Sequence, residues 1–497
     1  MIVLIGAALA AAPTLDGIAA LEKRVQTMGP LPVLIDSEGA LPPEAVLVSV
    51  ADAHPTVLGR MAEAEAARAK LMASRGFFDP NLDVELTTVP AGYYDYTSVD
   101  AGLTQATPLW GLQLTAGYRI GIEGENDFAP YNEILETLDA GEVRFEAKLP
   151  FLKGGPIDPG RAELRQSRLS VEEAQAQLRA ARLGVAIQAL DAYWKWRASA
   201  VAYDVQRRLA ELTIRRDTLV RRRIEEGTLP EVERAESLRA VLDRRNDALA
   251  AFRDLQNAGV SLSIFLRSED GLPLIPPQSQ APLRLDFEAA EAVEAGTIPG
   301  VVPNRPELRA IQQKVAKAEV ETRLRRNEAL PKVDGKLGLS KDFGDAQNEG
   351  ESSDRFIIFD PAELKLGLSV DFPVLLRKGR GIAAQARAQL DAIERKAQLT
   401  GEKLEAELRK LAQTIDALDA QTEVARDLQV AAEIAAAAAR RKFEIGTANL
   451  FDVFLRESKA AEASIKAAKV TAARSAARMV WELSTCQAAL REGLDPC

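Results

Sequence analysis

Residues 363–381 read ELKLGLSVDFPVLLRKGRG, and they contain the two patterns from which the fold can be predicted. In the first part, apolar residues alternate strictly with polar residues or glycine, the apolar set being Leu364, Leu366, Leu368 and Val370. Such period-2 alternation predicts a β-strand with one apolar and one polar face. The strand pattern reaches Pro373 and a turn rich in glycine and arginine, after which a helical pattern starts.

This helical pattern runs from about Gly381 to Ile445 and repeats every seven residues. The apolar residues that lie seven apart are Leu390, Ala397, Leu404, Leu411, Leu418, Ala425, Ala432 and Ala439. Sustained heptads predict coiled-coil packing against a neighbouring helix. At 1.5 Å per residue, the predicted helix is roughly 100 Å long.

The same order of patterns occurs earlier in the chain, so the sequence contains an internal repeat. Residues 142–155 read EVRFEAKLPFLKGG: they alternate, reach a proline and end in a glycine turn. A second long helical stretch, from about residue 160 to 226, follows that turn. Its apolar heptad residues are Leu164, Val171, Leu178, Val185 and Ala192.

Both long helical stretches end at a Gly-Thr pair, Gly227-Thr228 in the first repeat and Gly446-Thr447 in the second. A returning helix is predicted after each pair, at about 231–265 and 450–484. The sequence therefore predicts a mainly α protein with β-strands, built from two internal repeats. Each repeat is expected to be a β-strand pair plus a long coiled-coil helical hairpin.

The composition excludes most kinds of catalysis and nucleic-acid binding. The 497 residues include one histidine, His54, and two cysteines, Cys486 and Cys497. These counts exclude a His-ligated metal enzyme, a zinc finger and a scaffold of several disulfides. The formal net charge of −10 argues against a nucleic-acid binder, which needs a basic face. Because Arg305 takes the place of His54 in the second repeat, we interpret His54 as structural and expect no enzyme, cofactor or metal site.

The first residues resemble part of a secretory signal peptide. Residues 2–12 are an uncharged apolar run that ends in three alanines, as at an Ala-x-Ala cleavage site. The alternative is a helix N-terminus of the folded protein. No later segment reaches the ~18 uninterrupted apolar residues of a membrane-spanning helix. We therefore interpret the chain as exported, in which case Cys486 and Cys497 could pair as a disulfide.

These observations predict the following organisation of the chain. In order, it consists of a possible residual signal peptide (1–12), an N-terminal periplasmic segment (13–54), repeat 1 (55–270), an inter-repeat linker (271–304), repeat 2 (305–486) and a C-terminal tail (487–497). Strands are expected at about 82–152 and 333–372. The helical hairpins are expected at about 160–266 and 381–485.

The duplicated order of strands and long helical hairpins resembles the TolC-like outer-membrane efflux protein family, the outer membrane factors of tripartite efflux and type I secretion systems. The resemblance covers about residues 41–486. Its motifs are the helix-to-strand prolines Pro80 and Pro331, the run 149–155 (LPFLKGG), Arg223 with Gly227, residues 443–447 (FEIGT), and Asp452-Val453. Their order and their duplication together carry the resemblance.

The resemblance implies a homotrimer whose strands close one shared transmembrane β-barrel and whose helices form an α-helical barrel. The implied location is the cell outer membrane, with a long periplasmic extension. Implied partners are outer-membrane lipids, a periplasmic adaptor (membrane fusion) protein and, indirectly, an inner-membrane pump of the RND or ABC type; nucleic acid is not among them. The implied function is passive export through a channel. A soluble periplasmic coiled-coil scaffold or interaction protein is the alternative.

The sequence leaves two possibilities for the number of strands in the barrel. In the first repeat Pro150 lies 70 positions after Pro80, whereas in the second Pro373 lies 42 positions after Pro331. The extra length contains another alternating run, residues 112–122. Either two strands per repeat give twelve in a trimer, with a decorated loop, or a further hairpin enlarges the barrel. We expect twelve.

The resemblance also places the gate and the adaptor contact at the hairpin turns. Gate or lumen candidates are Asp452, six residues after Gly446, and Glu233, which holds the matching place after Gly227. In a trimer each would form a ring of three carboxylates that attracts cations. An ordinary solvated carboxylate is the alternative for each. Candidate adaptor contacts at the hairpin tips are Gly227, Thr228, Gly446, Thr447, Arg223 and Phe443.

Overall fold

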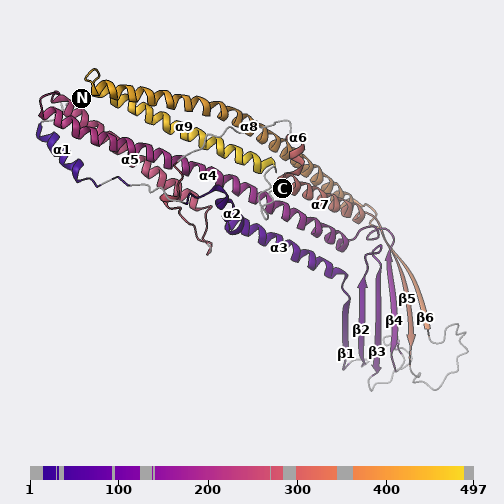
Figure 1. The fold of residues 1–497 in the computed structure, drawn as a ribbon. Helices are drawn as coiled ribbons and strands as arrows, with labels where there is room; N and C mark the ends of the chain where they lie inside the picture. The colour runs from indigo at the N-terminus through magenta and orange to yellow at the C-terminus, as the bar shows by residue number, and fades with distance from the viewer. Residues whose placement is uncertain are drawn as a thin grey trace, which may run out of the picture. The chain divides into compact units, whose positions relative to one another are not determined.

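The computed structural model describes residues 15–29, 31–32, 39–91, 96–123, 137, 140–268, 270–283, 298–343 and 362–485 of the chain. The signal peptide expected at residues 1–12 and the disulfide between Cys486 and Cys497 therefore lie outside the described residues. Long helices and one antiparallel sheet make up the described chain (Figure 1), which confirms the expected class, mainly α with β.

The helices and strands follow one another in two repeats of helix, strands and helical hairpin. In chain order they are α1 (Leu15–Thr27), α2 (Pro43–Ala53), α3 (Pro55–Arg75), β1 (Asn81–Val89), β2 (Tyr96–Ala106), β3 (Gln113–Glu123), β4 (Glu142–Pro150), α4 (Pro159–Glu225), α5 (Val232–Ser263), α6 (Ile298–Val301), α7 (Pro306–Glu328), β5 (Lys332–Asp342), β6 (Ala362–Asp371), α8 (Arg377–Glu444) and α9 (Leu450–Thr485). Within the described part of the chain, no helix is both long enough and apolar enough to cross a membrane.

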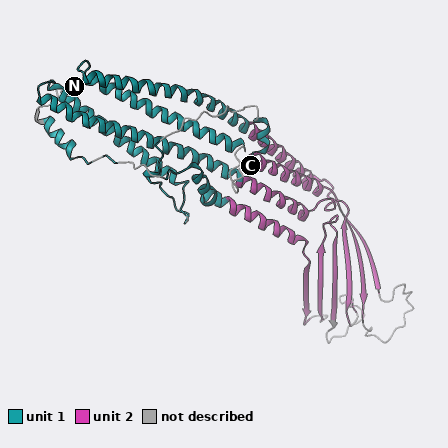
Figure 2. Cartoon of the chain, in the orientation of Figure 1, with its two compact units in different colours: residues 1–59, 179–305, 403–497 teal, residues 60–178, 306–402 magenta. Residues whose placement is uncertain are grey.

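The chain divides into two compact units (Figure 2). Unit 1 comprises residues 1–59, 179–305 and 403–497, and unit 2 comprises residues 60–178 and 306–402. Unit 1 therefore contains α1, α2, α5, α6 and α9, whereas unit 2 contains α7, the six described strands and all of α3 except its first five residues, 55–59. The long helices α4 and α8 each have residues in both units.

Unit 2 contains a six-stranded antiparallel sheet in the order β1-β2-β3-β4-β5-β6 (Figure 1). The first repeat contributes four of these strands and the second contributes two, so the expectation of one strand pair in the first repeat is wrong. Most of the alternating run at 112–122 is β3, which pairs with β2 from Ala106↔Gln113 onward. The connection reverses the chain at Trp110 and Gly111, whose φ angles of 48° and 69° are left-handed. The extra length is therefore a further hairpin.

The largest buried side chains of unit 1 belong to α4, where it packs against α2 and α5. Tyr193, Trp196 and Tyr203 are almost fully buried in one cluster with apolar residues of those helices. The hydroxyl of Tyr193 donates a hydrogen bond of 2.7 Å to the carbonyl oxygen of Leu41. Burial of this ring therefore leaves its polar atom satisfied.

The heptad series on α8 is the inward side of that helix. Every residue of the series from Leu390 to Ala439 is buried or half-buried. Leu408 and Ile415, in the alternate slot, are also buried, and they pack against Trp481 of α9. The seven-residue period thus marks the face along which the helix packs.

Candidate functional site at the hairpin tips

Both helical hairpins reverse through the same backbone motif. At the first turn, the Gly227 N–H donates to the carbonyl oxygen of Ile224 and the Thr228 N–H donates to that of Arg223, each at 2.9 Å. These are the two hydrogen bonds of a Schellman motif, which needs a left-handed residue at the position of the glycine. Gly227 has a φ of 73° there, so a side chain at this position would be strained.

The second turn repeats this geometry. The Gly446 N–H donates to the carbonyl oxygen of Phe443 at 3.1 Å, and the Thr447 N–H donates to that of Lys442 at 2.8 Å. Gly446 has a φ of 77°. In both turns the threonine hydroxyl donates to the same carbonyl as its own N–H, at 2.9 Å in the first turn and 3.1 Å in the second. The paired Gly-Thr motifs therefore have a structural cause: each ends an outgoing helix.

The two turns meet through side chains that were candidates on sequence grounds. The guanidinium carbon of Arg223, on α4, lies 5.7 Å from the centroid of the Phe443 ring on α8, within range of a cation–π contact. Both side chains are half-buried, whereas the four residues of the Gly-Thr pairs are exposed. The fold thus joins two of the six tip candidates across the hairpins and leaves the other four on the surface.

The two gate candidates occupy matching positions on the returning helices. Asp452 is exposed in the first turn of α9, and Glu233 is half-buried in the first turn of α5. The Asp452 N–H donates to the side-chain oxygen of Asn449 at 2.8 Å, which caps the start of α9. A carboxylate in a first turn is stabilised by the helix dipole. That local role is independent of the gate role, which stays a prediction.

A buried carboxylate that the sequence analysis did not single out joins the two hairpins. Glu457 of α9 is 3% exposed, and its two oxygens accept hydrogen bonds of 2.6 Å from the two terminal nitrogens of Arg216 on α4. The Nε of Arg440 on α8 lies 2.8 Å from the same carboxylate. One side chain therefore connects three long helices from both repeats, by two charge-assisted hydrogen bonds to Arg216 and an ion pair with Arg440.

The sequence contains a signal that could have identified Glu457. The buried stripe of α9 includes Leu450, Val453 and Ala460, and Glu457 occupies the place between the last two at helical spacing. A carboxylate in an apolar stripe needs a buried cationic partner. The identity of that partner was not readable, because Arg216 is far away along the chain.

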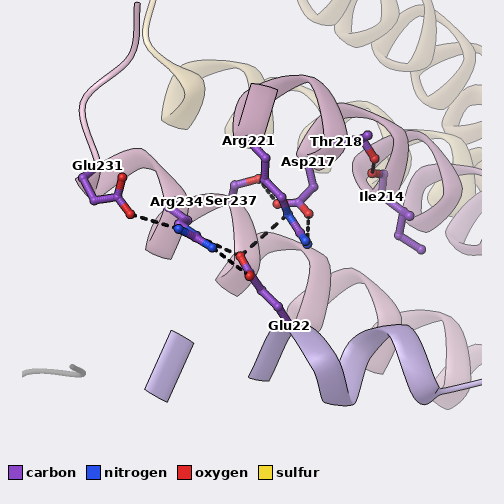
Figure 3. A network of polar contacts seen from close by, with 8 residues as sticks. All are labelled: Glu22, Ile214, Asp217, Thr218, Arg221, Glu231, Arg234 and Ser237. Carbon is purple, nitrogen blue, oxygen red and sulfur yellow. Dashed lines mark hydrogen bonds and ion pairs between the residues drawn. The ribbon is translucent and has the colours of Figure 1, made fainter. Parts of the chain in front are cut away.

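Helix α1 packs against the first hairpin near its tip (Figure 3). Glu22 of α1 accepts two hydrogen bonds from Arg234 of α5, at 2.9 and 3.0 Å, and lies 3.7 Å from Arg221 of α4. Arg221 also pairs with Asp217, which accepts a hydrogen bond of 2.6 Å from the hydroxyl of Ser237. The buried face of α1 thus carries an acid that connects to both helices of the hairpin.

The C-terminal end of α1 is held by a second arginine. Buried Arg245 of α5 donates to the carbonyl oxygens of Val25 and Met28, at 3.4 and 3.1 Å, and to that of Gly29. Carbonyls in the last turn of a helix lack partners within the helix. Arg245 therefore caps α1 and fixes where it ends on the hairpin.

Replacing Glu22 with glutamine should loosen α1 by about 1 kcal/mol, since a charged pair that is partly exposed is lost. This is roughly a five-fold rise in the undocked population. Trypsin cleavage after Lys23 and Arg24 measures that population. Glu231→Gln is the matched control, because it removes the exposed carboxylate that pairs with the same Arg234 at 3.2 Å. Equal cleavage rates for Glu22→Gln and the parent chain would contradict the assigned contact.

The same contact makes the docking of α1 sensitive to pH. The hydrogen bond from Arg234 lowers the pKa of Glu22 below its ordinary value of 4.5; burial opposes this shift, and the charges of Arg221 and Arg234 add to it. A group with a lowered pKa contributes stability above its ordinary value and loses it as the pH falls through the lowered one. Docking of α1 should therefore weaken only below about pH 4.5. Cleavage of Glu22→Gln by an acid-active protease should lack that dependence.

His54 lies between α2 and α3, in a position to cap α3. Its Nδ1 accepts a hydrogen bond of 3.2 Å from the Thr56 N–H, and its ring stacks on Phe265 with centroids 5.9 Å apart. Burial lowers the pKa of His54, and the charge of Arg267 lowers it further. The imidazole of His54 therefore has a structural role: it caps helix α3 and packs against Phe265.

Comparison with known proteins gives one match to a family model and several solved structures with a similar fold. Residues 300–454 match the family model described as outer membrane efflux protein. No curated protein sequence matches the chain. Among solved structures, VceC of Vibrio cholerae is 14% identical with a TM-score of 0.62, over 89% of this chain and 95% of that one. MtrE of Neisseria gonorrhoeae, in its open state, is 14% identical with a TM-score of 0.61, over 92% and 94%. A membrane protein of Pseudomonas aeruginosa is 15% identical with a TM-score of 0.62, over 92% and 96%.

Proposed function

We propose that this chain, whose residues 300–454 match the outer membrane efflux protein family, is the subunit of an outer-membrane efflux channel. It serves as the exit duct of a tripartite efflux or type I secretion system and passes its substrates passively. It lies in the outer membrane and extends far into the periplasm. The observation that carries this proposal is the apolar face of the six-stranded sheet.

One face of the sheet is apolar and exposed on all six strands. The register sets Leu82 opposite Leu103, Phe145 opposite Leu339 and Leu337 opposite Leu366, so the apolar side chains form one continuous surface. Its exposed large members are Leu82, Val84, Leu86, Leu103, Leu114, Tyr118, Phe145, Leu337, Leu339, Leu364, Leu366, Leu368 and Val370. Water disfavours an apolar surface of this extent, whereas the hydrocarbon of a bilayer accommodates it.

The opposite face of the sheet is polar and rich in ion pairs. Arg119 lies 2.8 Å from Glu142, and Lys148 lies 3.5 Å from Asp334. Arg144 pairs with Asp100, two strands away. A sheet with one lipid-compatible and one water-compatible face is what the wall of a transmembrane pore requires. The polar face therefore lines the lumen.

Other copies of the chain complete the channel, and we take three copies, as the family resemblance implies. Among the described strands, β1 and β6 each have a free edge, which a bilayer does not tolerate. Helix α8 also exposes apolar side chains outside its heptad series; these are Leu399, Val424, Leu428, Val430 and Ile434. Neighbouring copies in a helical barrel would cover both features.

The exposed Gly-Thr turns are our candidates for the contact with a periplasmic adaptor protein. They are surface positions with a rigid backbone, and the contact between Arg223 and Phe443 holds the two turns together. An adaptor that spans both turns links the channel to an inner-membrane pump of the RND or ABC type.

Asp452 is the carboxylate that we assign to the gate. Replacing it with alanine should raise the resting conductance or weaken the block by multivalent cations, because a ring of three charges is lost. Single-channel recording in planar bilayers measures both effects. Asp427→Ala, at an exposed position on α8, is the control. An Asp452→Ala record identical to that of the parent would remove Asp452 from the gate.

The proposed function is tested by purifying the chain in detergent and inserting it into planar bilayers. We expect a trimer by mass and a defined conductance. A monomer that gives no conductance contradicts the proposal. Release of the protein from membranes by a carbonate wash would instead support the soluble scaffold.

A further inference from the structure

The additional hairpin of the first repeat decides which strands meet between copies. Strand β3 is paired on both sides: β2 pairs along it from Ala106↔Gln113 to Tyr96↔Glu123, and β4 pairs with it from Lys148 onward. A strand has only two hydrogen-bonding edges. From Gln113 to Arg119, β3 therefore has no edge left for another chain, and among the described strands the free edges of the sheet are those of β1 and β6 (Figure 1).

Strands β1 and β2 are integral to the sheet rather than a loose decoration. On the polar face, the side chain of Arg144 reaches from β4 over β3 to Asp100 of β2. It can cross β3 because Gly117 lies in between: a Cβ there would be 3.0 Å from the Arg144 Nε. The hydroxyls of Thr104 and Thr115 are 3.1 Å apart across the β2–β3 pair. These contacts bind the hairpin to the strands that the second repeat extends.

The two free edges fit each other in direction and length. Six strands in alternating direction leave β1 and β6 antiparallel, as closure of a ring of antiparallel strands requires. Strand β1 has 9 residues and β6 has 10. The edges of two copies can therefore pair along their whole lengths.

The side chains at the two edges fit as well. On β1 the exposed apolar residues are Leu82, Val84 and Leu86, and on β6 they are Leu364, Leu366, Leu368 and Val370. Side chains alternate between the two faces of a strand. If the apolar residues of β1 and β6 are to lie on the same face of the barrel, even-numbered residues of β1 must therefore lie opposite even-numbered residues of β6. The polar faces then bring Asp83 and Glu85 of β1 beside the polar residues of β6, among which Lys365 already pairs with Glu363 at 3.1 Å.

We propose that β1 of one copy pairs antiparallel with β6 of the next, so that each copy contributes all six strands to the pore wall. This inference rests on the proposed trimeric channel. Three copies of the six-stranded sheet give eighteen strands, not the twelve expected from strand pairs. A barrel of about 16–18 strands encloses a water-filled channel. The additional hairpin thus widens the pore and adds the carboxylates of Asp83, Glu85 and Asp100 to its lining.

Cysteine cross-linking tests which strands meet. With Cys486 and Cys497 replaced by serine, Val84→Cys is combined in turn with Leu364→Cys, Leu366→Cys and Leu368→Cys. A disulfide forms only where the Cα atoms lie within about 7 Å. We expect linked dimers and trimers on non-reducing gels for at least one of the three pairs. Leu114→Cys on β3, combined with the same three partners, is the matched control and should give none.

The outcomes separate this inference from the proposed function. Cross-links from Leu114→Cys but not from Val84→Cys would show that β3 meets β6 and would overturn the six-strand wall. A conducting trimer that cross-links through neither position would also overturn it, and would leave the channel function intact. A monomer without conductance would remove the channel function, and the inference with it.

A deletion gives an independent measurement. Removing residues 81–107 joins Pro80 to Pro108 and turns β3 into the free edge. Because barrel diameter grows roughly linearly with strand number, the pore area and conductance of the variant should fall about two-fold. Cross-links between Leu114→Cys and β6 should then appear in the deleted chain. If the deleted chain still forms trimers and their conductance equals that of the parent, the hairpin lies outside the pore wall.

Discussion

Replacing Glu457 with alanine lowers the free energy of unfolding by about 3–5 kcal/mol, the expected cost of breaking a buried ion pair. The carboxylate is 3% exposed, and the side chain of its main partner, Arg216, is 10% exposed. Without Glu457 the guanidinium of Arg216 stays enclosed without its acid. Denaturant titration of the purified protein in detergent, followed by circular dichroism, measures the loss.

The control for this variant lies on the same helix. Glu462 pairs with Lys459 at 2.7 Å, but both side chains are more than half exposed. Glu462→Gln should therefore change the stability by less than about 0.5 kcal/mol. Replacing both Arg216 and Glu457 with apolar residues should recover most of the loss, because no buried charge remains. A Glu457→Ala variant as stable as Glu462→Gln would show that the contact between the hairpins contributes little.

Replacing Leu366 with arginine destabilises the protein in lipid vesicles by about 2–4 kcal/mol, as for a cation on the lipid face of a barrel. Leu366 is 76% exposed in the single chain and lies near the middle of β6. At so exposed a position in a water-soluble protein, the same change would be nearly neutral, within about 0.5 kcal/mol. Urea titration in vesicles, with assembly into trimers as a second readout, distinguishes the two environments.

Ser369→Arg is the control for the lipid face, because Ser369 lies on the polar face of the same strand. It should leave stability and assembly close to those of the parent. Equal tolerance of both arginines would contradict the assignment of the apolar face to the bilayer. If both variants were destabilised to the same extent, both faces of the sheet would be packed against other parts of the protein.

The parts of the site that could be predicted depend on neighbours along the chain. The Gly-Thr turns follow from helix ends that need a left-handed residue, and such an end can be recognised within about six residues. The sequence therefore predicts Gly227 and Gly446 as turn positions, and their φ angles of 73° and 77° confirm this. The pairing of Arg223 with Phe443 was not predicted, because it joins residues of different repeats.

The contacts of Glu457 and of α1 could not be predicted from the sequence. The burial of Glu457 arises when α4 and α8 approach α9, and the docking of α1 depends on Arg234 and Arg245, more than 200 positions away. Coulomb and hydrogen-bond energies depend on distance in space. A sequence can show that such an acid needs a partner, but not which residue supplies it.

The sequence by itself determined the long helices, their packing face and the alternation of the strands. Helical hydrogen bonds join residues four apart, so the heptads at 390–439 predict both the element and its buried side. Only the tertiary structure decided the strand count, the edges at β1 and β6, and the partners of the buried charges. A strand forms its hydrogen bonds with other strands, and whether residues 81–107 are a hairpin in the sheet or a loop depends on whether β3 offers them an edge.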